Sequence, residues 1–156
     1  MALTSAQLAT LKAAIAADGT LNAQPSDGTG LAFIADALNA VASPDFFVWR
    51  NNIPSSEIVA AITGSEFVAL TAQKQQGLML LLIPGTVDAS SSNVQADFSA
   101  IFSAGTTLTA LAALAHRKAT VIEKMFATGT GTTGSPAVAV FTGTVTPNDV
   151  DKARRS

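Results

Sequence analysis

The 156-residue sequence has no cysteine and no tyrosine, and it contains only one histidine and one tryptophan. Without cysteine, the chain can form no disulfide, thiolate nucleophile or cysteine zinc site. His116 is the single histidine, so a catalytic pair of nucleophile and base would otherwise have to be built from Ser, Lys, Asp and Glu side chains. We therefore expect that the chain is not an enzyme, that it has no catalytic residue, and that it binds no metal and no cofactor.

Charge is also scarce, because 13% of the residues are charged whereas 48% are hydrophobic. Such a surface repels neighbouring molecules only weakly, which favours an oligomer. The densest apolar run, residues 78–83, is far shorter than the roughly 20 residues of a membrane span. The amino terminus also lacks the basic start and apolar core of a signal peptide. We expect a soluble protein with no membrane partner.

The few charges are unevenly distributed along the chain. Residues 1–110 carry three bases and eight acids, a net charge of -5, whereas residues 111–156 carry six bases and three acids, a net charge of +3. Two interpretations stay open: an unevenly solvated surface, or head-to-tail charge matching between subunits. Neither half is basic enough to predict tight nucleic-acid binding.

Apolar residues recur at helical spacing through most of the chain. The pattern, with serine and threonine caps and glycine or proline stops, predicts five to seven helices and no solenoid repeat. The fold class is therefore mainly α, a compact helical bundle with a C-terminal extended arm that contains a short β segment. We place the helical domain at residues 1–127 and the arm at residues 128–156. The predicted helices cover residues 5–17, 31–41, 55–63, 72–83, 92–104 and 107–126.

Residues 45–50 concentrate aromatic and β-branched side chains between turn signals, which is typical of an extended segment. We expect Trp49 to anchor the core together with Phe47 or Phe46. The spacing of His116, Thr120 and Glu123 places them on one face of the last predicted helix. A His-Glu pair there could shuttle a proton, but a solvated polar face beside the neighbouring basic residues explains the same pattern.

After residue 127 the sequence turns to glycine and threonine. The run TGTGTTG at 128–134 follows a helix and leads to a strand, the reverse of a phosphate loop, so we interpret it as a flexible tether. A lone strand cannot satisfy its own backbone groups, which predicts that a partner chain completes it by β-addition. The predicted inter-subunit interface comprises Ala137, Val138, Ala139, Val140, Phe141, Thr146 and Pro147.

Several motifs resemble small structural proteins of tailed bacteriophages. They are FVWR at 47–50, IPxxEI at 53–58, FxxLT at 67–71, EKMFATGTG at 123–131 and the ending from Gly143 to Val150. The resemblance covers about two thirds of the chain and is to the head–tail connector, or adaptor, group. Neck, tail-terminator and head-completion proteins are similarly small, and a helical regulatory or binding module is the alternative of another class.

The resemblance implies a structural virion protein whose copies form a ring of about twelve on the portal. Its partners would be further copies of itself, the portal protein, tail or neck proteins, and double-stranded DNA that passes through the lumen without specific binding. Its location would be the virion, and the host cytoplasm during assembly. The chain has fewer basic residues than we would expect in a ring that binds DNA tightly. A weakly acidic channel, however, would let DNA slide.

Overall fold

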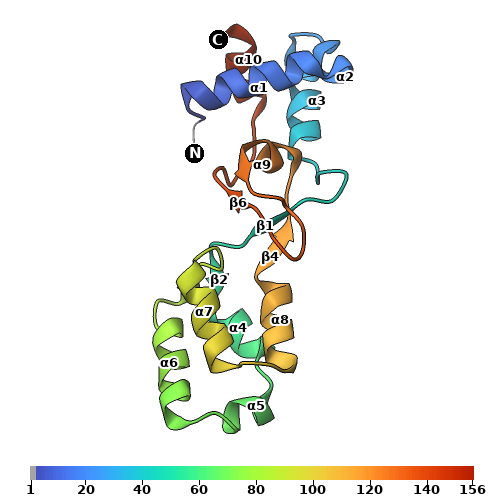
Figure 1. Ribbon diagram of the computed structural model, residues 1–156. Coiled ribbons are helices and arrows are strands. Elements are labelled where there is room, and N and C mark those ends of the chain that lie inside the picture. The colour runs from blue at the N-terminus through green and yellow to red at the C-terminus, as the bar shows by residue number, and fades with distance from the viewer. Residues whose placement is uncertain (1–2) are drawn as a thin grey trace. The chain divides into compact units, whose positions relative to one another are not determined.

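The computed structural model describes residues 3–156 and confirms the mainly helical fold class (Figure 1). This part of the chain forms ten helices, more than the five to seven expected, because several are only one or two turns long. The helices are α1 (Ser5–Ala17), α2 (Gly19–Asn22), α3 (Gly28–Asn39), α4 (Ser55–Ala61), α5 (Gly64–Val68), α6 (Ala72–Leu82), α7 (Ser92–Ile101), α8 (Thr106–Leu114), α9 (Val121–Phe126) and α10 (Pro147–Arg155). The strands are β1 (Phe47–Trp49), β2 (Ile53–Pro54), β3 (Thr86–Val87), β4 (His116–Lys118), β5 (Ala127–Thr128) and β6 (Val138–Ala139).

The described residues divide into two compact units, each assembled from separate segments of the chain. Unit 1 contains the residues up to Phe46, Lys118–Thr128 and Ala139–Ser156, and unit 2 contains Phe47–Arg117 and Gly129–Val138. The chain therefore passes between the units four times. Residues after 128 belong to both units, and Phe141, Val145, Val150 and Ala153 of the tail are part of the buried core of unit 1.

Unit 1 is built on α1, α3 and α10, in which α10 packs on both α1 and α3. Two of these helices begin with a capping box, in which Thr4 pairs with Gln7 and Thr146 pairs with Asp149. Pro147 occupies the first position of α10, where its missing N–H is not needed. The buried core of unit 1 comprises Leu11, Ile15, Ile34, Ala35, Leu38, Ile122, Phe141, Val145, Val150 and Ala153.

The start of α3 depends on a close approach between two backbone segments. Asp27 is the N-cap, and its Oδ1 accepts hydrogen bonds from the N–H groups of Thr29 and Gly30. A Cβ atom at Gly30 would lie 2.1 Å from the carbonyl oxygen of Pro25. Only glycine therefore fits at this position of the first turn.

The predicted helix over residues 107–126 is wrong. Helix α8 ends at Leu114, β4 follows, and α9 starts afresh at a capping box formed by Thr120 and Glu123. Ala119 lies in the break, where its N–H donates to Phe46 O at 2.8 Å and its carbonyl accepts from Ala42 N at 3.0 Å. The apolar residues keep their helical spacing across the break. The long-range backbone hydrogen bonds and the new cap nevertheless stabilise a non-helical conformation there.

Unit 2 contains α4 to α8 and the antiparallel pair β2–β3, in which Ile53 faces Val87 and Pro54 faces Thr86. Helix α4 packs on α8, and α6 packs on α7. Apolar residues from all these elements form one core, which is separate from that of unit 1. Its buried members are Ile53, Ile58, Leu78, Val87, Ala89, Phe98, Ile101, Phe102 and Leu111.

Strand β1 confirms the extended segment, and its most buried residue lies between the two predicted core anchors. The fully buried residue is Val48, at 0% exposure, whereas Phe47 and Trp49 on either side are half-buried. This is the alternation of a strand, which points successive side chains in opposite directions. Trp49 packs against the edge of the unit 2 core, and the Phe47 ring lies 5.3 Å from the His116 ring.

Candidate functional site

The predicted interface strand is paired inside its own chain. Within unit 2, Ala137 forms a parallel bridge with Val48. The Ala137 N–H donates to Phe47 O and the Trp49 N–H donates to Ala137 O, both at 2.9 Å. The premise that this segment lacks a partner for its backbone groups is therefore wrong, and β-addition to another chain is not needed to satisfy Ala137.

The side chains of the same segment alternate as the sequence predicted. Ala137 and Phe141 are buried, and Ala139 is half-buried, whereas Val138 and Val140 are exposed. The two valines are therefore the large apolar side chains of this segment that a partner could contact. The last two predicted interface residues, Thr146 and Pro147, are exposed and serve as the N-cap and first residue of α10.

The glycine-rich run is a hydrogen-bonded loop rather than a free tether. The carbonyl of Gly131 accepts from Phe47 N at 2.8 Å, and Thr132 and Ser135 exchange two backbone hydrogen bonds. Gly129 has a φ of 127°, and a Cβ there would lie 3.1 Å from the Cα of Ala137. This loop therefore uses glycine for backbone conformation and close approach.

The predicted helix face of His116, Thr120 and Glu123 does not exist, because His116 belongs to β4 and Thr120 caps α9. Glu123 is buried, and its Oε2 accepts from the Thr120 N–H at 3.0 Å, so the carboxylate is used to cap the helix. The His116 Nδ1 atom is buried and has no hydrogen-bond partner among residues 3–156. The proton-shuttle interpretation thus loses the geometry on which it rested.

Residues 3–156 contain no cluster of three or more His, Asp or Glu side chains that could hold a metal ion. Over the same residues, no helix combines the length and the apolar character needed to cross a membrane.

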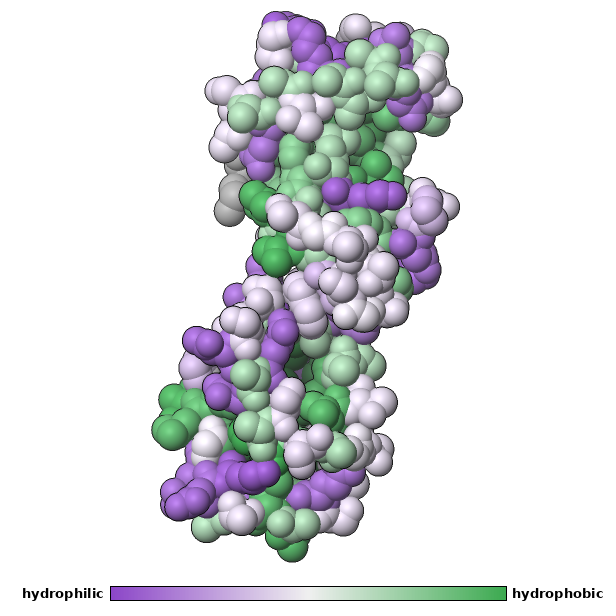
Figure 2. Space-filling model, viewed as in Figure 1, coloured by the Kyte–Doolittle hydropathy of each residue, from purple (hydrophilic) through white to green (hydrophobic). Residues whose placement is uncertain are grey.

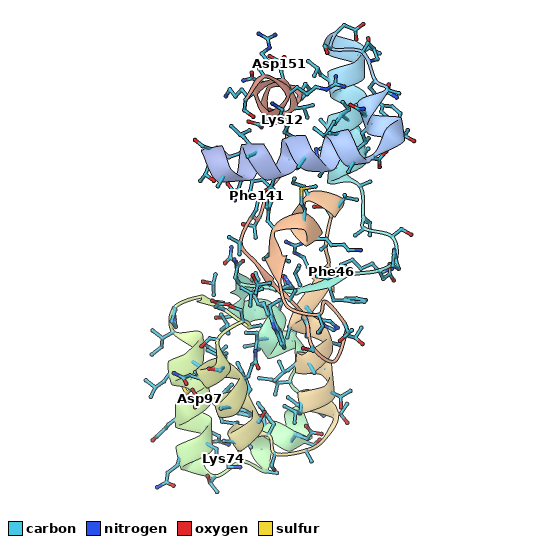
Figure 3. All side chains as sticks on the ribbon, turned by 45° about the horizontal axis from the view of Figure 1, so that its top comes forward. Lys12, Phe46, Lys74, Asp97, Phe141 and Asp151 are labelled. Atoms are coloured by element: carbon cyan, nitrogen blue, oxygen red, sulfur yellow. The ribbon has the colours of Figure 1, made fainter. Side chains whose placement is uncertain are left out.

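The charge difference between residues 1–110 and residues 111–156 does not appear as a difference between the two units of the fold. Unit 1 contains seven acidic and six basic side chains and unit 2 contains four and three, so that each has a net charge of -1. The basic C-terminal helix is used within unit 1, where the Arg154 guanidinium donates to the carbonyls of Asn22, Gln24 and Pro25. Lys12 donates to the carbonyl of Ser156, and Figure 3 shows Lys12 of α1 beside α10. Head-to-tail charge matching therefore has no support in this distribution.

Helix α6 presents a large exposed apolar face in unit 2. Met79, Leu80 and Ile83 are 64%, 67% and 74% exposed, and they are spaced to lie on one side of the helix and its C-cap. Figure 2 shows hydrophobic surface over this end of α6. Clustered large apolar side chains of this kind mark interaction surfaces more often than scattered single ones. We call these three residues the α6 face.

A groove between α6 and α7 adjoins the α6 face. Leu80, Leu81 and Ile101 supply apolar lining, and Lys74 and Asp97 supply one charge of each sign. The Lys74 Nζ atom donates to the carbonyl of Ile101 at 3.0 Å, which holds this side chain along the groove. Figure 3 shows Lys74 on α6 and Asp97 on α7. The α6 face thus has a partly polar border.

The core of unit 2 also contains a cavity of about 230 Å³ that is partly open to solvent. Its walls come from β1, the β2–β3 pair, α4, α7 and α8. None of the lining residues is charged. Ser99 and Ala112 are exposed at the surface and also line the cavity, so it opens between α7 and α8. The lining residues are Trp49, Ile53, Ile58, Val87, Ala89, Val94, Gln95, Phe98, Ser99, Leu108, Leu111, Ala112, Leu114 and Ala115.

Comparison with protein families, with curated proteins and with solved structures finds no match to this chain. The α6 face and the cavity are therefore described from their own geometry.

Sequence reasoning missed both features, although one signal was present. The run LMLLLI at 78–83 is apolar on every side, which indicates a helix that is either buried all round or shared with a neighbour. The structure buries Leu78 and exposes the opposite side of the helix. The cavity has no comparable signal, because its lining residues are mostly ordinary apolar residues from six elements that are separated in the sequence.

Proposed function

We propose that this chain is a structural protein of a tailed-bacteriophage particle, a connector whose copies form a ring between the portal and the tail or neck. The motifs quoted above supply the resemblance, and the observation that carries self-assembly is the exposed α6 face. The proposal includes no catalytic role. It places the protein in the virion, and in the host cytoplasm during assembly.

The α6 face has the composition of a contact surface between proteins. Three large apolar side chains occupy its centre, and Lys74 and Asp97 lie at the adjoining groove. Interfaces commonly combine an apolar centre with a polar rim. Burying an apolar side chain of this size contributes about 1.5–3 kcal/mol relative to leaving it in water, so the surface is costly unless it is covered. A further copy of the same chain is the proposed occupant.

The charge distribution suits a channel that DNA passes through without being held. Each unit has a net charge of -1, so neither attracts a polyanion strongly. In the proposed ring, double-stranded DNA is a passing partner, and the lasting contacts are those with neighbouring copies, the portal and the tail or neck proteins.

The test is to measure the oligomeric state of the wild-type chain and of the double variant Met79→Glu/Ile83→Lys by native mass spectrometry. The two new charges are four residues apart with the acid first, an arrangement that supports a helix. We expect a ring of about twelve copies, by resemblance, for the wild type and smaller species for the variant. Helical content by circular dichroism should be the same for both proteins.

The matched control is Val41→Lys, which adds charge at another exposed apolar residue, in unit 1. It should leave the oligomer unchanged. A wild-type chain that stays monomeric at every concentration and is absent from purified particles would contradict the proposal. Cross-linking within particles would separate a connector from another neck, tail-terminator or head-completion protein, because each has different neighbours.

The cavity in unit 2 favours the second candidate, a small helical binding module. An apolar pocket with a few polar groups is the usual form of a small-molecule site. Under this alternative the wild-type chain would be a monomer that binds a ligand in unit 2.

A further inference from the structure

We propose that the unit 2 cavity is a binding site for a compact, neutral, apolar molecule of one or two rings. Protein interiors are packed so closely that voids larger than a water molecule are few. Here the residues that form the core of unit 2, including Ile53, Phe98 and Leu111, surround a space that no side chain of the chain fills. The space is therefore a property of the core itself and not of a surface loop.

The volume sets the size of the molecule. An apolar cavity of about 150 Å³ in another protein is known to stay dry and to bind benzene. The cavity described here, at about 230 Å³, has room for a substituted benzene or a two-ring compound. Its opening beside Ser99 and Ala112 gives a path from solvent.

The residues that line the cavity determine which chemical class of ligand can bind. No charged residue contributes to the walls, so an ionised ligand would lose its hydration without compensation. Gln95 and Ser99 are the polar side chains on the α7 wall. The Gln95 Nε2 atom donates to Ala89 O at 2.7 Å, which fixes the amide and leaves its Oε1 as an acceptor for one ligand donor. The site is thus suited to a neutral apolar body with at most one polar atom.

Trp49 provides a direct test because it lines the cavity and is the only tryptophan in the chain. The probe is bromobenzene, whose heavy atom quenches indole fluorescence on contact. Binding in the cavity should give saturable quenching with one probe per chain. Benzoate, an anion of similar size, should give no saturable quenching.

Two leucine substitutions near the end of α8 form a matched pair. Ala115→Leu adds a side chain at a residue that lines the cavity and should weaken bromobenzene binding at least tenfold. Ala113→Leu adds the same side chain at an exposed residue that does not line it and should leave binding unchanged. The assembly variant Met79→Glu/Ile83→Lys should also bind normally, because none of its residues touches the cavity, so failure of the ring proposal would not affect this result.

The thermal stability of the wild-type protein gives a second measurement, which does not depend on whether Ala115→Leu folds. Bound ligand stabilises the folded state, so the Tm of the wild-type protein should rise with bromobenzene concentration and not with benzoate. Quenching that stays linear with concentration and equal in the wild type and both leucine variants would overturn the proposal. A wild-type Tm that does not rise would overturn it as well.

Discussion

The Glu66 carboxylate of α5 caps the first turn of α8 at Thr107. Its Oε2 accepts from the Thr107 N–H at 2.9 Å, and its Oε1 accepts from the Thr106 N–H at 2.8 Å. The residue before the helix is Gly105, which has no side chain to serve as a cap and has a φ of 124°. A side chain 40 residues away thus replaces the missing N-cap and joins two helices of unit 2.

This contact makes part of the stability of unit 2 depend on pH. Hydrogen bonds from the Thr107 hydroxyl, and then from the N–H groups of Thr107 and Thr106, lower the pKa of Glu66 from its ordinary value of 4.5. A lowered pKa means that the contribution is present above pH 4.5 and is lost as the pH falls through the folded-state value. We therefore expect Glu66→Gln to have a lower Tm at neutral pH and a shallower loss of Tm on acidification. Thermal unfolding between about pH 6 and about pH 3 checks this, and parallel curves for the two proteins would contradict it.

The two glycines in the first turn of α3 should respond differently to alanine. Gly30→Ala places a Cβ 2.1 Å from Pro25 O, so we expect a loss of about 1–3 kcal/mol in the free energy of unfolding. Gly28→Ala meets nothing within 4 Å, and we expect it to be neutral or to stabilise by up to about 1 kcal/mol. Urea titration of both variants measures the difference. Equal values would mean that the contact at Pro25 relaxes freely.

Two adjacent residues of the tail test whether it belongs to the core of unit 1. Phe141 is 2% exposed, and its ring packs edge-on against that of Phe126, with centroids 5.9 Å apart. Phe141→Ala should destabilise unit 1 by about 3–5 kcal/mol. Val140 is 65% exposed, and Val140→Ala should change stability by no more than about 0.5 kcal/mol. Chemical denaturation followed by circular dichroism distinguishes the two, and an equally small effect of Phe141→Ala would show that this ring contributes little to the core of unit 1.

The two arginines at the end of α10 form another contrasting pair. Arg154 donates to three carbonyls at the end of α2 and in the segment after it, with its closest contact to Gln24 O at 2.9 Å. We expect Arg154→Ala to cost about 1.5–3 kcal/mol, in the range of hydrogen bonds made by charged groups. Arg155 has an exposed side chain that pairs with Asp151 four residues earlier, for which about 0.5 kcal/mol is the expected cost. A smaller effect for Arg154 than for Arg155 in thermal unfolding would refute this assignment.

Local signals in the sequence predicted the helical class and many helix boundaries. Helix α1 lies where it was expected, because the Thr4–Gln7 capping box and the Leu8, Leu11 and Ile15 stripe act within a few residues. Its Leu11 and Ile15 are buried as predicted. The extended segment at residues 47–49 was also predicted correctly from its composition.

Long-range contacts decided the elements that the sequence did not predict. The break at residues 115–119 depends on hydrogen bonds between Ala119 and residues 42 and 46, which helical periodicity cannot anticipate. The pairing of Ala137 with Val48 spans almost 90 residues, and sequence reasoning therefore assigned that strand to another chain. The cavity is harder still to predict from sequence, since it arises where the side chains of six elements do not fill the space between them.

The discontinuous makeup of unit 1 fixes the order in which the protein can mature. Helix α1 is synthesised before the long segment of unit 2, but Val150 and Ala153 of α10, which complete the same core, are synthesised after it. The long continuous segment of unit 2, Phe47–Arg117, emerges in between. The apolar faces of α1 and α3 that α10 covers therefore lack this partner while Phe47–Arg117 is synthesised, and the core of unit 1 can be completed only after α10 has emerged.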